Sequence, residues 1–376
     1  MKILLHVSGE VGTKGKNRIE FERKLARNIK LKTKAKITRA FGSFLLEIEP
    51  GLKALLKSIP GIAWIAECIE SEKSLEGLEQ AALKLAREKR FSEFDIEVRR
   101  AWKGFELTSQ EVRQELIKKL AQEGLTFNPK SKNKIYVEIN KDWFVLFSEK
   151  EKGVGGLPTS TSGKALALLS GGIDSAVASF LAMKKGFELI FLHFHNYPSN
   201  DYKIIDEKII SLVKKLNDFQ LRSKLYIISF VDAQKEIIKV IQPKYRMMCY
   251  RWLMFKIAEV IASKEKAKVL VSGDSLGQVA SQTPENLSLI IKSSSLPIFM
   301  PLLTFDKAET IELAKKIGTY EISIMHYADC CSFMIAKHPA TKLKQELFDK
   351  IIKKIKAKAK KLVAESIKNA RVEIIC

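Results

Sequence analysis

The sequence predicts an α/β protein in which a doubly wound parallel sheet forms the carboxyl-terminal half. Three observations predict this fold class. Short apolar runs alternate with helical stretches after residue 164, a glycine-rich segment at 153–163 precedes them, and a serine–glycine turn directly follows the first run. Buried strands that alternate with helices are typical of a parallel sheet covered by helices on both faces.

The composition excludes several classes of protein. The 376 residues are 46% hydrophobic, which is ordinary for globular proteins and excludes wholesale disorder. No apolar run approaches the roughly 18 residues that cross a bilayer, and Glu10 comes too early for a secretory signal. Five cysteines in so long a chain are not a disulfide framework. We therefore expect a cytoplasmic protein with no membrane partner.

The net charge of +22 favours a polyanionic partner. It arises from 65 Lys and Arg against 43 Asp and Glu, and the alternative is a solvated, lysine-rich surface. A dense set of cations lies within residues 14–39, and others lie at 99–103 and 130–134. Cations that displace counterions from phosphates bind nucleic acid without reading its sequence. The basic stretch 342–368 has helical spacing, and we interpret it as an exposed helix face.

The first region, residues 1–57, is predicted to be a small domain. It opens with a strand at Lys2–Val7 and continues through a glycine-punctuated loop to a basic helix that begins near Ile19. A strand around Ser43–Glu49 follows. A Pro-Gly pair at 60–61 marks the next boundary.

The second region, residues 58–152, is predicted to be an α+β module. Its patterns predict a helix, a strand, a helix and two strands: Leu75–Lys89, Asp95–Arg99, Ser109–Glu123, Lys134–Ile139 and Trp143–Ser148. The glycine-, serine- and threonine-rich residues 153–163 then predict a linker.

The third region, residues 164–376, contains the alternating pattern. Four apolar runs predict buried parallel strands: Ala165–Leu169, Leu189–Phe194, Leu225–Val231 and Lys268–Val271. Further along, Asp306 is followed three residues later by Glu309. We interpret this pair as the capping box of a helix and not as catalytic acids.

The strongest motif directly follows the first of these strands. It consists of Ser170, Gly171, Gly172, Ile173, Asp174 and Ser175, and a helical pattern resumes after it. Glycines let backbone N–H groups approach an anion closely, and a helix N-terminus adds its positive dipole end. The motif lacks the Lys-Ser/Thr ending of a Walker A loop. The alternative is a tight turn without a ligand. A carboxylate at Asp174 makes sense if it holds Mg²⁺ beside phosphates.

Other motifs follow the order and spacing of one family: Gly12–Arg18, Gly155–Pro158, Tyr250–Glu259, Gly273–Thr283, Ile317–Ile324, and Cys331 with Pro339–Thr341. The serine–glycine string resembles the PP-loop of ATP pyrophosphatases, and all the motifs together resemble the tRNA 4-thiouridine synthetases (tRNA sulfurtransferases). The resemblance covers essentially the whole chain. It implies a ferredoxin-like domain at 1–57, a THUMP RNA-binding domain at 58–152 and a Rossmann-like PP-loop domain at 164–376. The chain stops at Cys376, so we expect the form without a rhodanese domain.

The resemblance also implies binding residues. For ATP they are the loop residues Ser170, Gly171, Gly172, Asp174 and Ser175, together with Leu168, Leu169, His193, Phe194, Arg251, Gly273 and Gln282. Arg251 is expected to neutralise phosphate charge, and His193 to line the pocket at a strand end. Two histidines, His193 and His195, could suggest a metal, but no third ligand lies at a recognisable spacing. For tRNA the motif at 12–18 and the basic cluster at 99–103 together give the expected residues: Lys14, Lys16, Asn17, Arg18, Arg100 and Lys103.

The cysteines are expected to carry the sulfur step. Cys331 falls at the family's position and is expected, with Asp174, to be catalytic. It would attack a persulfide and resolve it as a disulfide, or carry the sulfur itself. Cys249 and Cys330 are candidates for a sulfur relay. The three thiols could also ligate an iron–sulfur cluster, which is less favoured because no CxxC motif is present. Cys68 is expected in the core.

The expected activity is ATP-dependent adenylation of uridine 8 of tRNA, followed by replacement of its O4 with sulfur. Expected partners are tRNA, a cysteine desulfurase or another persulfide or sulfide donor, and a second copy of the chain in a homodimer. One alternative is a PP-loop ligase that modifies another RNA base or a small molecule. The other is a non-catalytic tRNA-binding protein with a vestigial loop.

Overall fold

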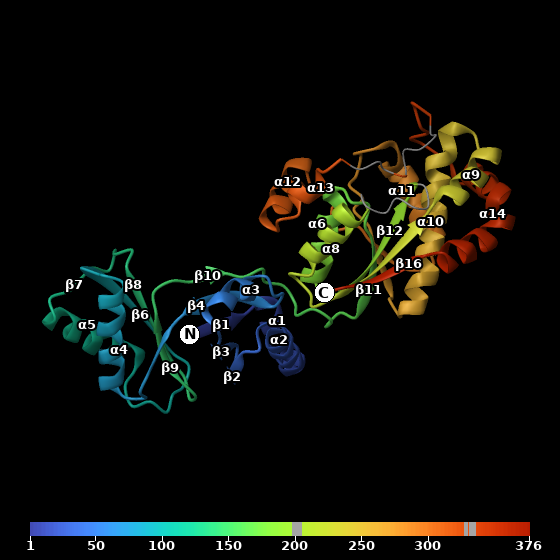
Figure 1. The fold of residues 1–376 in the computed structure, drawn as a ribbon. Coiled ribbons are helices and arrows are strands. Elements are labelled where there is room, and N and C mark those ends of the chain that lie inside the picture. Colours follow the sequence, from blue (N-terminus) through green and yellow to red (C-terminus); the bar gives the residue numbers. More distant parts are fainter. Residues whose placement is uncertain (198–204, 327–329, 331–335) are drawn as a thin grey trace. The chain divides into compact units, whose positions relative to one another are not determined.

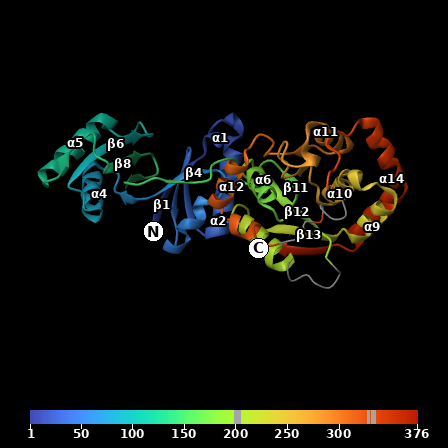
Figure 2. The same cartoon turned by 90° about the horizontal axis from the view of Figure 1, so that it is seen from above.

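The chain forms two compact units, Met1–Pro158 and Thr159–Cys376. Both are seen in the computed structural model, which describes residues 1–197, 205–326, 330 and 336–376 (Figures 1 and 2). The first unit contains two five-stranded sheets, and the second contains one six-stranded sheet.

The first sheet of the first unit is antiparallel throughout, in the order β10-β4-β1-β3-β2. Its elements are β1 (Lys2–Val7), α1 (Gly9–Gly12), α2 (Arg18–Thr33), β2 (Lys36–Ala40), β3 (Ser43–Glu47), α3 (Lys53–Lys57), β4 (Ile62–Glu67) and β10 (Glu151–Lys152). β1 is apolar on both faces, and this explains its continuous hydrophobic run. Ile3 and Leu5 pack with Leu25 of α2, whereas Leu4 packs with Trp143 of the second sheet.

The second sheet has the order β5-β9-β8-β6-β7 and is covered by two helices. Its elements are β5 (Ile69–Ser71), α4 (Leu75–Glu88), β6 (Glu93–Arg100), α5 (Ser109–Gln122), β7 (Thr126–Phe127), β8 (Lys134–Ile139) and β9 (Phe144–Phe147). Leu78 and Leu116 on the two helices form one core with Phe94 and Ile135 of the sheet. The helices and longer strands expected from the sequence are therefore confirmed to within two residues.

The glycine-rich segment is not a free linker over its first half. β10 pairs with β4, and the N–H of Gly153 then donates to Ala63 O (2.9 Å). Gly155 donates to Ile62 O and accepts from the Gly61 N–H, both at 2.8 Å. The chain thus returns to the first sheet before it enters the second unit. The first domain was expected to end at residue 57. Its sheet includes β4 (Ile62–Glu67), so it extends beyond that boundary.

The second unit is the doubly wound sheet that the sequence predicts. Its order is β15-β14-β11-β12-β13-β16, with all neighbouring pairs parallel except β13 and β16. The strands are β11 (Lys164–Leu168), β12 (Glu188–His195), β13 (Ser223–Ser229), β14 (Val269–Val271), β15 (Ile298–Phe299) and β16 (Arg371–Ile375). The chain leaves β11 toward β12 and later returns to its other side at β14. Ligands of such sheets bind at this reversal, outside the carboxyl ends of the strands.

Helices cover both faces of this sheet (Figure 1). One group consists of α6 (Ile173–Lys184), α8 (Ser211–Leu216), α12 (Lys307–Lys316) and α13 (Tyr320–Ser323), and the other of α9 (Val231–Val240), α10 (Pro243–Glu265), α11 (Pro284–Ser293) and α14 (Gln345–Lys368). α14 buries Phe348, Ile351 and Leu362 and exposes its lysines, which confirms the basic helix face. Within the described part of the chain, no helix carries an apolar stretch long enough to cross a membrane.

Candidate nucleotide and RNA sites

The serine–glycine loop connects β11 to α6 at the reversal of strand order. Gly171 has a φ of 89°, and a Cβ there would lie 2.8 Å from Ile209 Cδ1. Gly273, after β14, approaches the start of α6 so closely that a Cβ would lie 2.6 Å from Ser175 N. Both positions therefore require glycine. The loop is tied by Ser175 Oγ, which accepts from the Ser170 N–H (3.2 Å) and donates to Gly172 O (3.1 Å).

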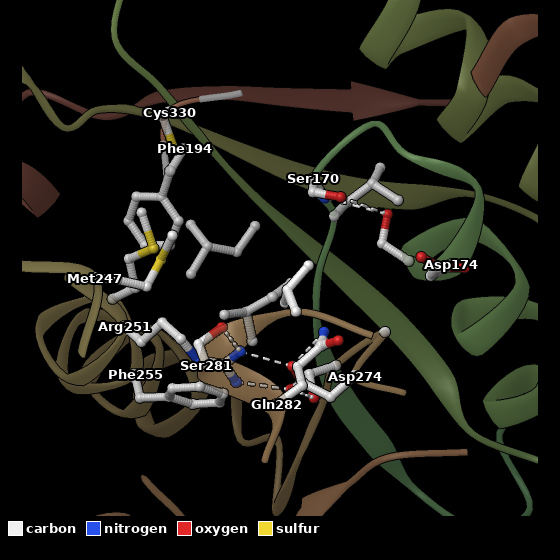
Figure 3. A pocket seen from close by; sticks show the side chains of 18 of the residues that line it. Ser170, Asp174, Phe194, Met247, Arg251, Phe255, Asp274, Ser281, Gln282 and Cys330 are labelled. Atoms are coloured by element: carbon white, nitrogen blue, oxygen red, sulfur yellow. Dashed lines mark hydrogen bonds and ion pairs between the residues drawn. The ribbon is translucent and has the colours of Figure 1, made fainter. Parts of the chain in front are cut away.

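A cavity of about 560 Å³ opens beside this loop, which is the size of many small-molecule sites. Nine of the expected ATP residues line it: Leu168, Leu169, Ser170, Asp174, Ser175, Phe194, Arg251, Gly273 and Gln282. Met247 and Met254 of α10 also line the cavity and add apolar side chains to its wall. Figure 3 shows Phe194 and Cys330 at one end of the cavity and Asp274 and Gln282 at the other.

Arg251 does not present a free charge to this cavity. Its guanidinium donates to both carboxylate oxygens of Asp274, at 2.7 and 2.8 Å (Figure 3). Ser272 and Gln282 also donate to that carboxylate, at 2.6 and 3.1 Å. Burial of Asp274 favours its neutral form, yet Arg251 and the two hydrogen bonds outweigh burial and lower the pKa of the carboxyl. Asp274 is therefore an ionised site residue that was not among those expected.

Gln282 provides a test of whether a nucleotide fits. Its amide nitrogen is used by Asp274, whereas its amide oxygen is buried and accepts no hydrogen bond from any described residue. Buried polar atoms are rarely left without a partner. An unsatisfied acceptor at the polar end of the cavity fits a ligand that brings a hydrogen-bond donor, such as a nucleotide.

Asp174 lies at the start of α6, where its carboxylate is already paired. Lys307 Nζ lies 2.8 and 3.0 Å from the two oxygens, and Gln278 Nε2 donates to one of them at 3.0 Å. Lys307 is the first residue of α12, whose capping box is confirmed: the Asp306 N–H donates to Glu309 at 2.8 Å. Lys307 was missed because its neighbours indicate only a helix start. The folded chain nevertheless pairs its ammonium with Asp174.

His193 does not line the cavity. It is completely buried, and its Nδ1 lies 2.7 Å from Leu169 O, so it supports the end of β11 from behind. Burial lowers the pKa values of His193 and His195 to about 4, which keeps both imidazoles neutral at physiological pH. Among the residues that the structure describes, no three His, Cys, Asp or Glu side chains form a group that could hold a metal ion.

The cysteines differ sharply in their surroundings. Cys330 lines the cavity, and its carbonyl accepts a hydrogen bond from Gln234 (2.7 Å). Cys331 lies outside the described residues. Cys249 is completely buried in the core, and burial raises the pKa of its thiol to about 12. A buried, protonated thiol is a poor nucleophile, so the structure does not support the relay expected of Cys249. Cys68 is confirmed as a core residue.

All six expected RNA-binding residues lie in the first unit, but they are not equally available. Lys16, Asn17 and Lys103 are exposed, whereas Lys14 is half-buried with its ammonium 5.2 Å from the Phe21 ring.

The two arginines of this set make contacts within the protein. Arg18 pairs with Glu22 at 2.7 Å, and its side chain is 14% exposed. Arg100 donates to the carbonyls of Phe105 and Leu107, at 2.8 and 2.9 Å. Both arginines are thus engaged within the protein, and Lys16 and Lys103 are the exposed cations of this set.

The fold and the site define a PP-loop nucleotide-binding protein with an amino-terminal unit of two further domains. Comparison with known families agrees in each part: residues 2–66 match the ThiI ferredoxin-like domain, 72–149 the THUMP domain, and 160–357 the thiamine biosynthesis protein (ThiI) family. The chain belongs to the ThiI family.

Curated relatives extend the similarity over the whole chain. One from Thermoanaerobacter sp. (strain X514) is 38% identical over 387 aligned positions and covers 99% of both chains. Another from Geobacillus kaustophilus (strain HTA426) is 36% identical and covers 90% of this chain and 87% of its own. Both are named "Probable tRNA sulfurtransferase".

Solved structures show the same similarity. One, described as "Crystal structure of a 4-thiouridine synthetase - RNA complex with bound ATP", aligns over 100% of both chains with a TM-score of 0.91 and 33% identity. PH1313 from Pyrococcus horikoshii Ot3 aligns with a TM-score of 0.63 over 85% of this chain and 100% of its own, at 21% identity, and shows a shared fold.

Proposed function

We propose that this chain is an ATP-dependent tRNA sulfurtransferase that converts uridine 8 of tRNA to 4-thiouridine. The observation that carries the proposal is the nucleotide-sized cavity beside the Ser170–Ser175 loop, at the carboxyl end of β11. The relatives named as tRNA sulfurtransferases and the ATP-bound 4-thiouridine synthetase support it. In this reaction O4 of the uracil attacks the α-phosphorus of ATP and pyrophosphate leaves. A sulfur nucleophile then displaces AMP from C4.

The residues divide the binding of ATP between two ends of the cavity. The loop N–H groups and the N-terminus of α6 hold phosphate oxygens, since both carry positive partial charge. Phe194 and Met254 enclose the base at the apolar end, and Gln282 Oε1 offers the nucleotide an acceptor at the polar end. Arg251 acts through Asp274, because that ion pair fixes the carboxylate that in turn orients the Gln282 amide.

Asp174 and Lys307 stand where the phosphates enter. A single carboxylate together with phosphate oxygens is a donor set that Mg²⁺ accepts, so Asp174 would hold this ion. The ion would supply charge neutralisation of the triphosphate. The Lys307 ammonium, 2.8 Å from an oxygen of Asp174, would stabilise the negative charge that grows on the pyrophosphate.

The sulfur donor and the assembly are further parts of the proposal. Cys331 remains the proposed thiol, and Cys330 is a second one because it lines the cavity. The sulfur comes from a cysteine desulfurase or another persulfide donor, and two chains associate so that one tRNA spans both. A thiolation assay that compares free sulfide with desulfurase-generated persulfide tests the donor, and sedimentation tests the dimer.

Replacing Asp174 with Asn tests the site. We expect ATP-dependent thiolation of transcript tRNA to fall by at least about a hundredfold, a loss typical of a charged group that acts in the transition state. Asp232→Asn is the matched control, because that carboxylate is 86% exposed and lies in the same unit. Thiouridine absorbance measures the product. Normal turnover by the Asp174 variant would contradict the assigned site.

A further inference from the structure

Phe41 lies at the tip of the hairpin between β2 and β3 and is the most exposed large hydrophobic residue of the described chain, at 81%. A two-residue turn of this kind normally carries small or polar side chains. The ring belongs to none of the three hydrophobic clusters described in the first unit. Its place in the fold therefore gives no structural reason for a phenylalanine.

The ring is nevertheless held in place. The Arg18 guanidinium lies over it, with Cζ 3.7 Å from the ring centroid. Arg18 is itself fixed by Glu22, at 2.7 Å between Nε and Oε1, and both side chains are nearly buried. Gly42 follows the ring with a φ of 81°, and a Cβ there would overlap Arg18 Nη2. Arginine and ring thus form a preorganised stack with one ring face covered and the rest of the ring in solvent.

Exposed cations lie close to this stack in the chain. Lys16 lies just before α2, Arg23 lies on α2, and Arg39 lies two residues before the ring on β2; all three are exposed. In the described part of the chain, no carboxylate pairs with any of them. Free cations draw in phosphates, and an open aromatic face with an arginine behind it is the chemistry that stacks an unpaired base. An apolar protein surface would have to desolvate these same charges.

We propose that the Arg18–Phe41 stack binds an unpaired nucleobase of the tRNA substrate, while Lys16 and Arg39 contact the adjoining phosphates. The inference rests on the proposed function, because it takes tRNA as the ligand. It changes the role of Arg18 from a phosphate contact to the support of a stacking platform. It also assigns a binding role to Phe41, which no motif of the sequence indicates.

Affinity for transcript tRNA, measured over a series of salt concentrations, separates stacking from charge. Phe41→Ala should weaken binding about tenfold at every salt concentration, the size of one lost base stack. Phe41→Tyr should bind as the parent does, because a tyrosine ring also stacks. Lys16→Ala is the matched control. It should make the plot of log affinity against log salt less steep, by about one unit of slope. Phe41→Trp should show quenched fluorescence when tRNA binds.

Several results would overturn the proposal. The first is a Phe41→Ala variant that binds tRNA as tightly as the parent. The second is a change in the salt dependence of binding by that variant. The third is weaker tRNA binding by Phe41→Tyr. Altered sedimentation of Phe41→Ala with unchanged affinity would place the ring in a protein interface instead. Because the ring lies outside these hydrophobic clusters, Phe41→Ala should keep the parent's thermal unfolding.

Two controls separate this inference from the proposed function. A blunt RNA duplex without unpaired bases should bind Phe41→Ala and the parent equally, and a tenfold difference there would exclude base stacking. If the parent binds tRNA through Phe41 but does not thiolate it, the proposed function fails and the platform stands. If thiolation proceeds and Phe41→Ala binds normally, only the platform fails.

Discussion

Arg251 shows how far a residue's role depends on its neighbours. The resemblance implies a contact to phosphate, and the structure places Arg251 inside α10, between the cavity-lining residues Met247 and Met254. The structure places both of its terminal nitrogens on Asp274, a residue 23 positions later. A buried, bidentate ion pair is costly to break, since the remaining charge loses its partner. Arg251 is therefore first a positioning residue for the polar end of the cavity.

Replacing Arg251 with Lys distinguishes these roles. Lysine keeps the charge but cannot donate two parallel hydrogen bonds. We expect the free energy of unfolding of the second unit to fall by about 2 kcal/mol, because Asp274 is left partly unsatisfied. ATP affinity should fall with it, since Gln282 loses its orientation.

Denaturant unfolding and calorimetric titration with ATP measure the two effects. Arg222→Lys, at an exposed position of the same unit, is the control. If Arg251→Lys is as stable as the parent but binds ATP more weakly, Arg251 contacts phosphate directly instead.

At the scale of elements, β1, β3 and β8 meet around one buried carboxylate. Glu138 on β8 lies 2.8 Å from His6 Nε2 of β1 and 3.3 Å from Ser43 Oγ of β3. The His6 ring also stacks on Trp64 of β4, at 4.1 Å between centroids. This cluster joins the two sheets of the first unit through polar contacts, beside the apolar contact of Leu4 with Trp143. A sequence pattern cannot show this pairing, since its members are far apart in the chain.

The cluster predicts a pH dependence. Burial of Glu138 favours the neutral acid, but His6 and Arg99 outweigh it and lower the pKa of the carboxyl below its ordinary value of 4.5. A lowered pKa stabilises the folded state above the ordinary value, and this stability is lost as the pH falls through the folded-state pKa. Glu138→Gln should therefore cost about 3 kcal/mol near pH 7 and less below about pH 4.

Thermal unfolding of both proteins at the two pH values measures the difference. Glu97→Gln, an exposed position on β6, controls for general effects of a lost charge. A cost for Glu138→Gln that does not change with pH would contradict the assigned ionisation.

Other elements show why prediction succeeded unevenly. β1 and β8 were predicted to the residue, because both are continuous apolar or alternating runs with clear ends. β2 was missed, since Lys36–Ala40 is polar and mostly exposed. β16 was missed as well: it is a short edge strand with Val372 and Ile374 in solvent. Edge strands bury too little surface to leave a hydrophobic pattern.

At the scale of the whole molecule, the net charge of +22 is divided between surfaces with different roles. The cations of residues 14–39 lie on and beside α2 and β2, the elements next to the Arg18–Phe41 stack, whereas the lysines of α14 cover the solvent face of a helix in the second unit. The two sets have similar charge density in the sequence. Only the first set has an exposed aromatic ring close to it in the chain, at Phe41, and this favours it as the tRNA-binding surface.

Salt dependence of tRNA binding tests this division. A triple variant with Ala at Lys16, Arg23 and Arg39 should make the plot of log affinity against log salt less steep, by about three units of slope. The matched triple variant on α14, with Ala at Lys353, Lys356 and Lys360, should leave the slope unchanged, because these exposed lysines form a solvated face. Filter binding between low and physiological salt measures both. A less steep salt dependence in the α14 variant would show that the RNA-binding surface also includes the second unit.

The chain's order of apolar runs, its glycines and its short motifs were enough to predict the doubly wound sheet, the phosphate loop and most of the cavity wall. Such features are local: Gly171 is needed because of its own backbone angle, and Leu168 and Phe194 lie at strand ends that hydrophobic runs reveal. The pairings of Arg251 with Asp274, Lys307 with Asp174, and Arg18 with Phe41 became visible only in the folded molecule. Each joins side chains from separate elements, and folding alone determines which charges are neutralised by a neighbour and which remain free for a ligand.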